Sequence, residues 1–305
     1  MNLKDCTLEE LVNCFITKPQ AIEDFYKLCH NIKAGNTISL LFNPHRLDTT
    51  TCNAPVSVYQ SMKQDDKLDG LARLYLYTLE CGTNKPFYNA VQRGYNGVHY
   101  VNEFPPFVAR SVYLKYKNKD NNIKILDPCA GWGGRMIGAA SIPNTTYVAF
   151  EPSTATYNGL LKLGEWLKCL QPTFNYKIYN MPFEDNTLDE KFDVALTSPP
   201  YYDTEHYSDE ETNSLNRYKT FEEWCDGFYA VLLKKAVNLL EDDAKFIINV
   251  GARLYPLDKE LYRICKENNF YCEEIESYLS GNGEGREKFY CVSKNKAIKK
   301  SKKLF

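Results

Sequence analysis

Hydrophobic and polar positions follow two different patterns along the chain, and the change between them lies near residue 120. Before it, apolar residues recur mainly at helical spacing, for example in LDGLARLYLYTLE, residues 68–80. Thr7 followed by Glu10 is typical of a capping box, which marks the start of a helix. The pattern therefore predicts a mainly helical N-terminal region over residues 1–119, with a loop over the turn-rich residues 43–55.

After residue 119 the pattern changes to short apolar runs separated by helical stretches. Five strand–helix alternations are followed by two closely spaced strands, and the runs are IKILD, TYVAF, NYKIY, FDVALT, KFIINV, FYCEEIE and KFYCVS. This order predicts an α/β domain over residues 120–295, with a Rossmann-like, doubly wound sheet of seven strands whose last strand is antiparallel. Residues 280–287 are expected to form the loop before the last strand. Residues 296–305 are a lysine-rich basic tail. Three interpretations of this tail stay open: a solvated, solubilising end, a segment that contacts phosphate, and a nuclear signal.

Composition and charge narrow the class of protein. The chain has 305 residues, enough for one large domain or for a catalytic domain with a smaller companion. Its apolar runs are too short for a bilayer, and its N-terminus, MNLKDCTLEELVNCF, is charged and amphipathic, unlike a signal peptide. We therefore expect an intracellular, reducing compartment, cytoplasm or nucleus, and no membrane. The formal charge of −2 confines any contact with nucleic acid to a local patch.

Cysteine and histidine usage argues against disulfides and metal. The eleven cysteines are odd in number and scattered, and no CxxC pair occurs, so reduced core thiols are expected. The four histidines form no close cluster with cysteines, so no metal site is expected.

A glycine-rich segment, LDPCAGWGGR, residues 126–135, follows the first predicted strand. Glycines at this position let a ligand approach the backbone closely before a helix begins. The spacing of Gly131, Gly133 and Gly134 does not match the G-x-G-x-x-G fingerprint of dinucleotide sites. Asp127 precedes the turn, where its carboxylate can pair with an ammonium group, as at the amino-acid end of S-adenosylmethionine (SAM).

Acidic residues follow the next two predicted strands. Glu151, after the second strand, can accept hydrogen bonds from two neighbouring ribose hydroxyls; the alternative is a carboxylate that caps the following helix. After the third strand, Glu184 or Asp185 can accept from an adenine amino group, and Phe183 can flank the ring. For this segment an ordinary acidic turn is the alternative.

The segment TSPPYYD, residues 197–203, follows the fourth predicted strand, which lies beside the first in a doubly wound sheet. Two consecutive prolines hold the backbone extended and offer no N–H groups. Ser198, Pro199 and Pro200 therefore form a stiff segment with carbonyl acceptors and few donors, which is costly to bury without a purpose.

The motif DPCAGWGG followed by SPPY resembles the SAM-dependent amino-methyltransferases of DNA, which methylate the exocyclic nitrogen of cytosine or adenine. The resemblance covers about residues 120–293, and the motif order is similar to the gamma-type arrangement. NEFPPFVARSVY, residues 102–113, resembles the segment that closes over the methionine part of SAM in this family. Cys129 and Trp132 stand where the family more usually has small or different aromatic residues. Residues of the motifs and of the acidic turns above give the cofactor candidates Asp127, Pro128, Cys129, Ala130, Gly131, Gly133, Glu151, Glu184, Asp185, Phe104 and Pro105, and the catalytic candidates Ser198, Pro199, Pro200 and Tyr201.

The residues of SPPY suit the chemistry that this resemblance implies. An exocyclic amino group is a poor nucleophile because its lone pair is delocalised into the ring. The Ser198 hydroxyl and the Pro199 carbonyl can each accept one N–H, which stabilises the positive charge that develops on nitrogen. Tyr201 can stack on a base taken out of its helix. In this family SPPY is commoner in N4-cytosine enzymes than in N6-adenine enzymes, so cytosine is slightly favoured.

Alternatives to a DNA methyltransferase remain open. An RNA-base methyltransferase or a protein-glutamine methyltransferase would have the same motif order, although the latter normally carries Asn before the two prolines. A SAM-binding, non-catalytic subunit of a nucleic-acid-modifying complex is a third possibility. DNA is the expected partner, and the sequence leaves a protein partner or a homodimer undetermined.

Overall fold

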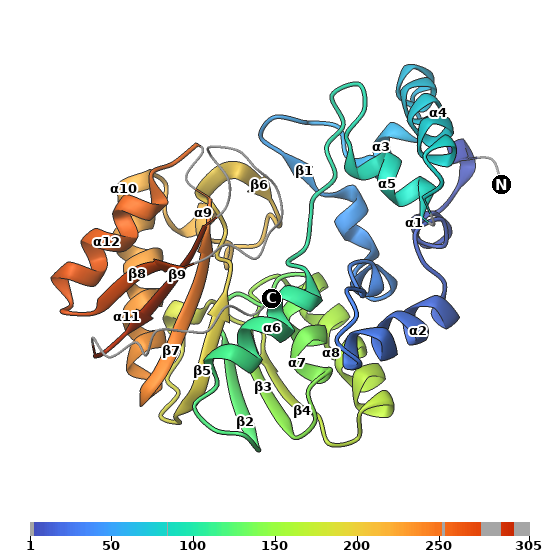
Figure 1. Ribbon diagram of the computed structural model, residues 1–305. Coiled ribbons are helices and arrows are strands. Elements are labelled where there is room, and N and C mark those ends of the chain that lie inside the picture. The colour runs from blue at the N-terminus through green and yellow to red at the C-terminus, as the bar shows by residue number, and fades with distance from the viewer. Residues whose placement is uncertain (1–2, 84, 252–253, 276–287, 296–305) are drawn as a thin grey trace.

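The predicted sheet is present in the computed structural model, which describes residues 3–83, 85–251, 254–275 and 288–295 (Figure 1). Its seven strands lie in the spatial order β4-β3-β2-β5-β7-β9-β8. β9 pairs antiparallel with both of its neighbours, β7 and β8. The strands β4, β3, β2, β5 and β7 are parallel to one another. The predicted α/β class, doubly wound sheet and antiparallel last strand are therefore confirmed. The strands are β2 (Ile123–Asp127), β3 (Thr145–Phe150), β4 (Asn175–Tyr179), β5 (Phe192–Thr197), β7 (Leu240–Val250), β8 (Tyr271–Ile275) and β9 (Lys288–Ser293).

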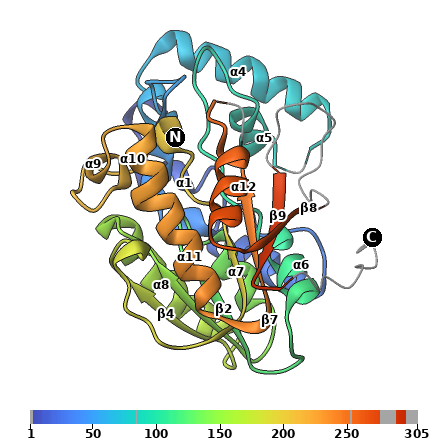
Figure 2. The same ribbon diagram turned by 90° about the vertical axis from the view of Figure 1, so that its left-hand side faces the viewer.

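The two faces of the sheet bury separate hydrophobic cores because successive strand residues point to opposite sides. In β2, Ile125 belongs to one core and Leu126 to the other. Helices cover both faces, as Figures 1 and 2 show. The first face carries α6 (Pro106–Tyr116), α7 (Gly134–Ala140) and α8 (Thr154–Leu170). The second carries α10 (Phe221–Trp224), a π-helical turn (Cys225–Tyr229), α11 (Ala230–Asn238) and α12 (Leu257–Glu267).

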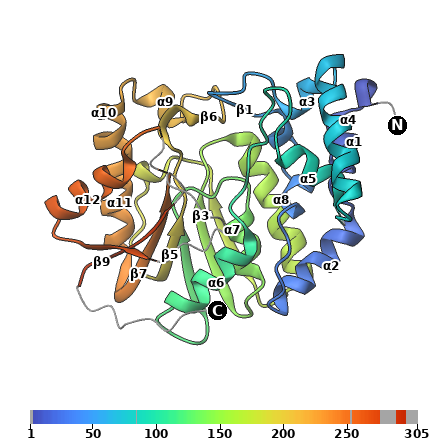
Figure 3. The ribbon, with the colours of Figure 1, turned by 45° about the horizontal axis from the view of Figure 1, so that its top comes forward.

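The N-terminal region is mainly helical, and Thr7 begins its first α-helix with the predicted capping box. Part of the predicted loop 43–55 is a strand instead, because β1 pairs antiparallel with β6 (Figure 3). This partner lies about 150 residues further along the chain, so the local sequence pattern could not indicate it. The elements before α6 are η1 (Leu3–Asp5), α1 (Leu8–Val12), α2 (Lys18–Cys29), η2 (Ile38–Leu41), η3 (Pro44–Asp48), β1 (Thr50–Thr51), α3 (Val58–Ser61), α4 (Asp65–Glu80) and α5 (Pro86–Gln92). Between β4 and α10 lie η4 (Phe183–Asp185), η5 (Tyr202–Thr204), β6 (Glu205–His206) and α9 (Ser214–Arg217).

The N-terminal region shares the core of the first sheet face. Phe25 of α2 and Phe42 contact Trp166 of α8, with ring centroids 6.0 and 5.5 Å apart. α6 packs against α7 and against β5, although it precedes residue 119. The hydrophobic core is thus continuous across the predicted domain boundary. The predicted hairpin loop 280–287 and basic tail 296–305 lie outside the described residues. Among the helices that are described, none combines the length and the apolar character that a bilayer crossing requires.

Replacing Gly159 by alanine should destabilise the fold. An ideal Cβ at Gly159 would lie 2.0 Å from Asn43 Oδ1 and 2.6 Å from the Phe42 carbonyl oxygen, so the N-terminal region would have to shift away from α8. This clash opposes the gain of about 1 kcal/mol that alanine usually brings to a helix interior. We expect the free energy of unfolding to fall by about 2 kcal/mol in urea denaturation. Asn158→Ala, at an exposed position of the same helix, is the control, and equal stability of the two variants would contradict the prediction.

Candidate functional site

A cavity of about 1140 Å³ opens at the carboxyl ends of the parallel strands, where β2 and β5 lie side by side and the strand order reverses. Most of the residues predicted from the sequence line it, including both halves of the candidate site. They are Phe104, Pro105, Pro128, Cys129, Ala130, Gly131, Glu151, Glu184, Ser198, Pro199, Pro200 and Tyr201. Three predicted residues, Asp127, Gly133 and Asp185, are not part of this lining.

Asp127 lies beneath the cavity, fully buried, where it holds the site together. Its Oδ2 accepts hydrogen bonds from Arg135 Nε at 2.7 Å and from the Tyr147 hydroxyl at 2.5 Å. Its Oδ1 accepts from the Thr197 hydroxyl at 2.9 Å and from the Cys129 N–H at 3.2 Å. A carboxylate has about four lone-pair sites, so these donors fill it. The structure therefore contradicts the predicted pairing of Asp127 with a ligand ammonium group: an arginine eight residues away in sequence has taken that place.

The glycine turn has two sides with different functions. Gly131, with φ of 55°, faces the cavity, and its N–H donates to Glu151 Oε2 at 3.0 Å. Gly133, with φ of 102°, faces the protein: an ideal Cβ there would lie 2.5 Å from Leu163 Cδ2. Gly133 therefore allows α7 to pack against α8, and it is not among the residues that line the cavity.

Glu151 follows β3 and is 8% exposed at the cavity wall. Besides the Gly131 N–H, it accepts the Ser153 N–H at 2.9 Å through Oε1. Burial raises the pKa of Glu151 to about 8, and the two backbone hydrogen bonds oppose that rise. The carboxyl is thus fixed in position and can accept further hydrogen bonds from a ligand. The second bond also matches the alternative interpretation, a carboxylate at the start of a helix.

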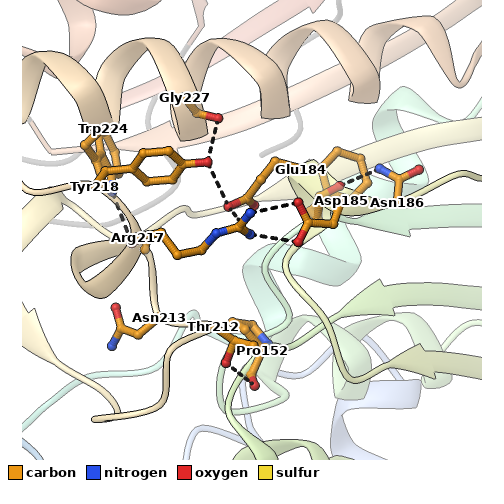
Figure 4. A network of polar contacts seen from close by, with 12 residues as sticks. Pro152, Glu184, Asp185, Asn186, Thr212, Asn213, Arg217, Tyr218, Trp224 and Gly227 are labelled. Carbon is orange, nitrogen blue, oxygen red and sulfur yellow. Dashed lines mark hydrogen bonds and ion pairs between the residues drawn. The ribbon is translucent and has the colours of Figure 1, made fainter.

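Arg217 of α9 separates the functions of Glu184 and Asp185, as Figure 4 shows. Its guanidinium binds Asp185 through two hydrogen bonds of 2.9 Å and Glu184 Oε1 through one of 3.0 Å. Asp185 is thereby held at the protein surface, away from the cavity, so of the two predicted acceptors only Glu184 lines it. Oε2 of Glu184 is buried and accepts no hydrogen bond from the described residues. A ligand amino group could satisfy that oxygen.

The SPPY segment leaves β5 and directs its polar groups toward a residue on β7. The hydroxyls of Ser198 and Tyr201 lie 3.1 Å apart, and each lies within hydrogen-bond distance of Asn249 Oδ1, at 3.3 and 3.2 Å. Asn249 Nδ2 donates to the Lys288 carbonyl at 3.2 Å, which turns the amide oxygen toward the two hydroxyls. Gly251, just after β7, leaves room for the Tyr201 ring, since an ideal Cβ there would lie 3.0 Å from it.

The next residue, Tyr202, has φ of 57°, in the left-handed region, and begins η5. Its ring packs against Phe221 and Tyr255, with centroids 5.5 and 5.0 Å away, whereas Tyr201 lines the cavity. Most carboxylates of the acidic loop that follows bind neighbours: Asp203 accepts from Tyr255, Asp209 pairs with His206, Glu205 accepts from Tyr207, and Glu210 accepts from Thr154.

The segment before α6 lies across the glycine turn. The Phe104 carbonyl approaches Gly134 so closely that an ideal Cβ there would lie 2.0 Å from its oxygen. Phe104 and Pro105 thereby line the cavity beside the turn, and so does Glu103, which the sequence analysis did not select. Asn249 and Arg217 were not predicted from the sequence either. A polar residue at the end of the apolar run KFIINV was an available signal for Asn249, whereas nothing local marks Arg217.

Comparisons with known proteins leave the family open. No protein-family model and no curated protein sequence matches the chain. Among solved structures, the chain is similar to a putative rRNA methylase from Clostridium thermocellum, with 11% identity, a TM-score of 0.41 and coverage of 63% of this chain and 97% of that chain. A TehB-like SAM-dependent methyltransferase from Corynebacterium glutamicum has 12% identity, a TM-score of 0.41 and coverage of 72% and 99%. The glycopeptide N-methyltransferase MtfA has 13% identity, a TM-score of 0.43 and coverage of 61% and 86%.

The buried carboxyl of Glu151 should make stability depend on pH. Its pKa is raised from about 4.5 to about 8 in the folded protein, so the folded state holds a proton that the unfolded state has lost between these values. This contribution to stability is complete below pH 4.5 and is lost as pH rises through about 8. Relative to Glu151→Gln, the wild type should therefore lose up to a few kcal/mol of unfolding free energy between about pH 5 and 8 in urea denaturation. Parallel profiles of the two proteins would contradict this.

Proposed function

We propose that the protein transfers a methyl group from SAM to the exocyclic amino nitrogen of a base in DNA. The observation that carries this proposal is the meeting of two motifs in one cavity: SPPY faces the glycine turn, with Ser198, Tyr201 and Asn249 in mutual hydrogen-bond distance. The cavity volume of about 1140 Å³ is sufficient for a nucleoside cofactor together with a planar target group.

The residues present fit SAM as the cofactor. Gly131 presents backbone close to the cavity, and Glu151 offers carboxyl oxygens that can accept hydrogen bonds from ribose hydroxyls. Glu184 has a buried oxygen that needs a donor such as the adenine amino group. Arg135 is the only arginine or lysine among the described residues that line the cavity, against four acidic side chains, Glu103, Glu151, Glu184 and Glu205. Burial raises the pKa of Glu103, Glu151 and Glu184, and a cationic ligand would stabilise their ionised forms, so the site favours such a ligand. When bound, SAM supplies an electrophilic methyl group.

Ser198, Pro199 and Asn249 prepare the target nitrogen. When the Ser198 hydroxyl donates to Asn249 Oδ1, its lone pairs are left to accept an N–H from the target amine. The Pro199 carbonyl, fixed by the two consecutive prolines, accepts the second N–H. Two acceptors stabilise the positive charge that develops on the attacking nitrogen. The Tyr201 ring offers a surface on which a base taken out of its helix can stack.

The acidic lining bears on the substrate. Without a lysine and with Arg135 already paired to Asp127, the described lining offers little to hold a phosphate, so the phosphates of DNA stay outside and the base alone enters. N4 of cytosine is slightly favoured over N6 of adenine, on the serine of SPPY. The same charge distribution favours a second candidate, the side-chain amide of glutamine in a protein, because that target carries no phosphate.

Product analysis tests the proposed function. Labelled SAM is incubated with the protein and with separate DNA, RNA and protein pools, and labelled fractions are identified by mass spectrometry. We expect N4-methylcytosine or N6-methyladenine in DNA, lost in Tyr201→Ala. Label only in RNA or on glutamine would replace the DNA assignment, and SAM binding without any label would favour a non-catalytic subunit.

Asn249→Leu should slow catalysis without lowering the affinity for the cofactor. The substitution removes the acceptor that orients Ser198 and Tyr201, while both hydroxyls remain. We expect kcat to fall roughly tenfold or more, since two positioned hydrogen bonds are lost, each worth about 1 kcal/mol, and about 1.4 kcal/mol corresponds to a factor of ten. KM for SAM and the Kd of S-adenosylhomocysteine should be unchanged, which separates this effect from loss of folding. A variant with unaltered kcat would refute the positioning role.

A further inference from the structure

We propose that Glu103, held in place by the N-terminal region, binds the ammonium group at the amino-acid end of the cofactor. This inference rests on the proposed function, because it concerns the same cofactor. It fills the role that the sequence analysis gave to Asp127, whose carboxylate is occupied by protein donors.

One oxygen of Glu103 is fixed by the N-terminal region. Oε2 accepts hydrogen bonds from Arg46 Nη1 at 2.5 Å and from the Ser39 hydroxyl. The side chains of Arg46 and Glu103 are 0% and 3% exposed. Arg46 Nη2 in turn donates to the Tyr100 hydroxyl at 2.6 Å, which fixes the guanidinium. These contacts leave the carboxyl group of Glu103 little freedom to rotate.

The other oxygen has no partner. Glu103 Oε1 is buried and accepts no hydrogen bond from any residue that the structure describes, although Glu103 lines the cavity. Its carboxyl carbon lies 3.5 Å from an ideal Cβ on Gly134, so this oxygen sits beside the first turn of α7 and close to the glycine turn. A buried acceptor without a donor costs about 1–3 kcal/mol, and more when it is charged. A ligand that brings a donor to this point recovers that free energy.

Charge selects an ammonium group as the donor. Arg46 pairs with Glu103 Oε2, and Arg135, whose charge also acts on Glu103, is hydrogen-bonded to Asp127, so Oε1 receives no hydrogen bond from either arginine. A hydrogen bond between an ammonium and a carboxylate is roughly twice as strong as one between neutral groups. Because Ser39 and Arg46 precede the catalytic sheet in the chain, the N-terminal region completes the cofactor site instead of only covering it.

Two nucleoside ligands that differ at the amino-acid end test this assignment by isothermal titration calorimetry. S-adenosylhomocysteine carries the ammonium group, and 5′-methylthioadenosine lacks the whole amino-acid end. In Glu103→Gln, the Kd of S-adenosylhomocysteine should rise about tenfold or more. The Kd of 5′-methylthioadenosine should stay unchanged. Glu184→Gln is the matched control, because it acts on the adenine end and should weaken both ligands equally.

A second variant guards against misfolding, since Glu103→Gln leaves the buried Arg46 without its partner. Arg46→Met combined with Glu103→Gln removes both charges and should show the same selective loss of S-adenosylhomocysteine. Unchanged affinity for S-adenosylhomocysteine in both variants, or equal weakening of the two ligands, would overturn the assignment. If the wild-type protein binds neither ligand, the proposed function itself fails, and this inference with it.

Discussion

The buried carboxylate of Asp127 is the interaction on which the site depends. It accepts hydrogen bonds from Cys129, Arg135, Tyr147 and Thr197, which belong to the glycine turn, α7, β3 and β5. These segments meet at the carboxyl edge of the sheet, where the cavity opens. An ionised group without exposure is tolerated only when its hydrogen bonds are satisfied, so the four donors must hold their places together. The glycine turn and the start of SPPY are thereby fixed relative to each other.

The same principle recurs around the cavity with arginines from distant segments. Arg46 occupies one oxygen of Glu103, and Arg217 occupies one oxygen of Glu184. In each case the second carboxylate oxygen is left buried without a partner, on a residue that lines the cavity. Each arginine thus orients an acidic side chain while leaving acceptor capacity for a ligand. An arginine suits this function because its planar fork stays charged and fixes the carboxylate by geometry as well as by charge.

The distribution of charge relates the cavity to the proposed reaction. Buried acidic side chains, whose ionised forms a cation would stabilise, suit a cationic cofactor, and acceptors from Ser198 and Pro199 suit an amino group that gains positive charge. Phosphate finds no comparable partner among the described lining residues. A DNA substrate must therefore bind through surfaces beyond the cavity and present only its base. A protein amide carries no phosphate, so this constraint does not apply to it.

The order of strands, the positions at their carboxyl ends and the meeting of the glycine turn with SPPY followed from the sequence alone. They depend on hydrophobic periodicity and on the rule that parallel strands end at one edge, and both are local or topological. The tertiary structure alone decided which side chains at that edge face a ligand. Asp127 forms an ion pair with Arg135, and Asp185 forms one with Arg217. Arg46 binds one oxygen of Glu103, whose other oxygen is left for the cavity. Such pairings depend on where distant side chains meet after packing, and hydrophobic periodicity carries no information about them.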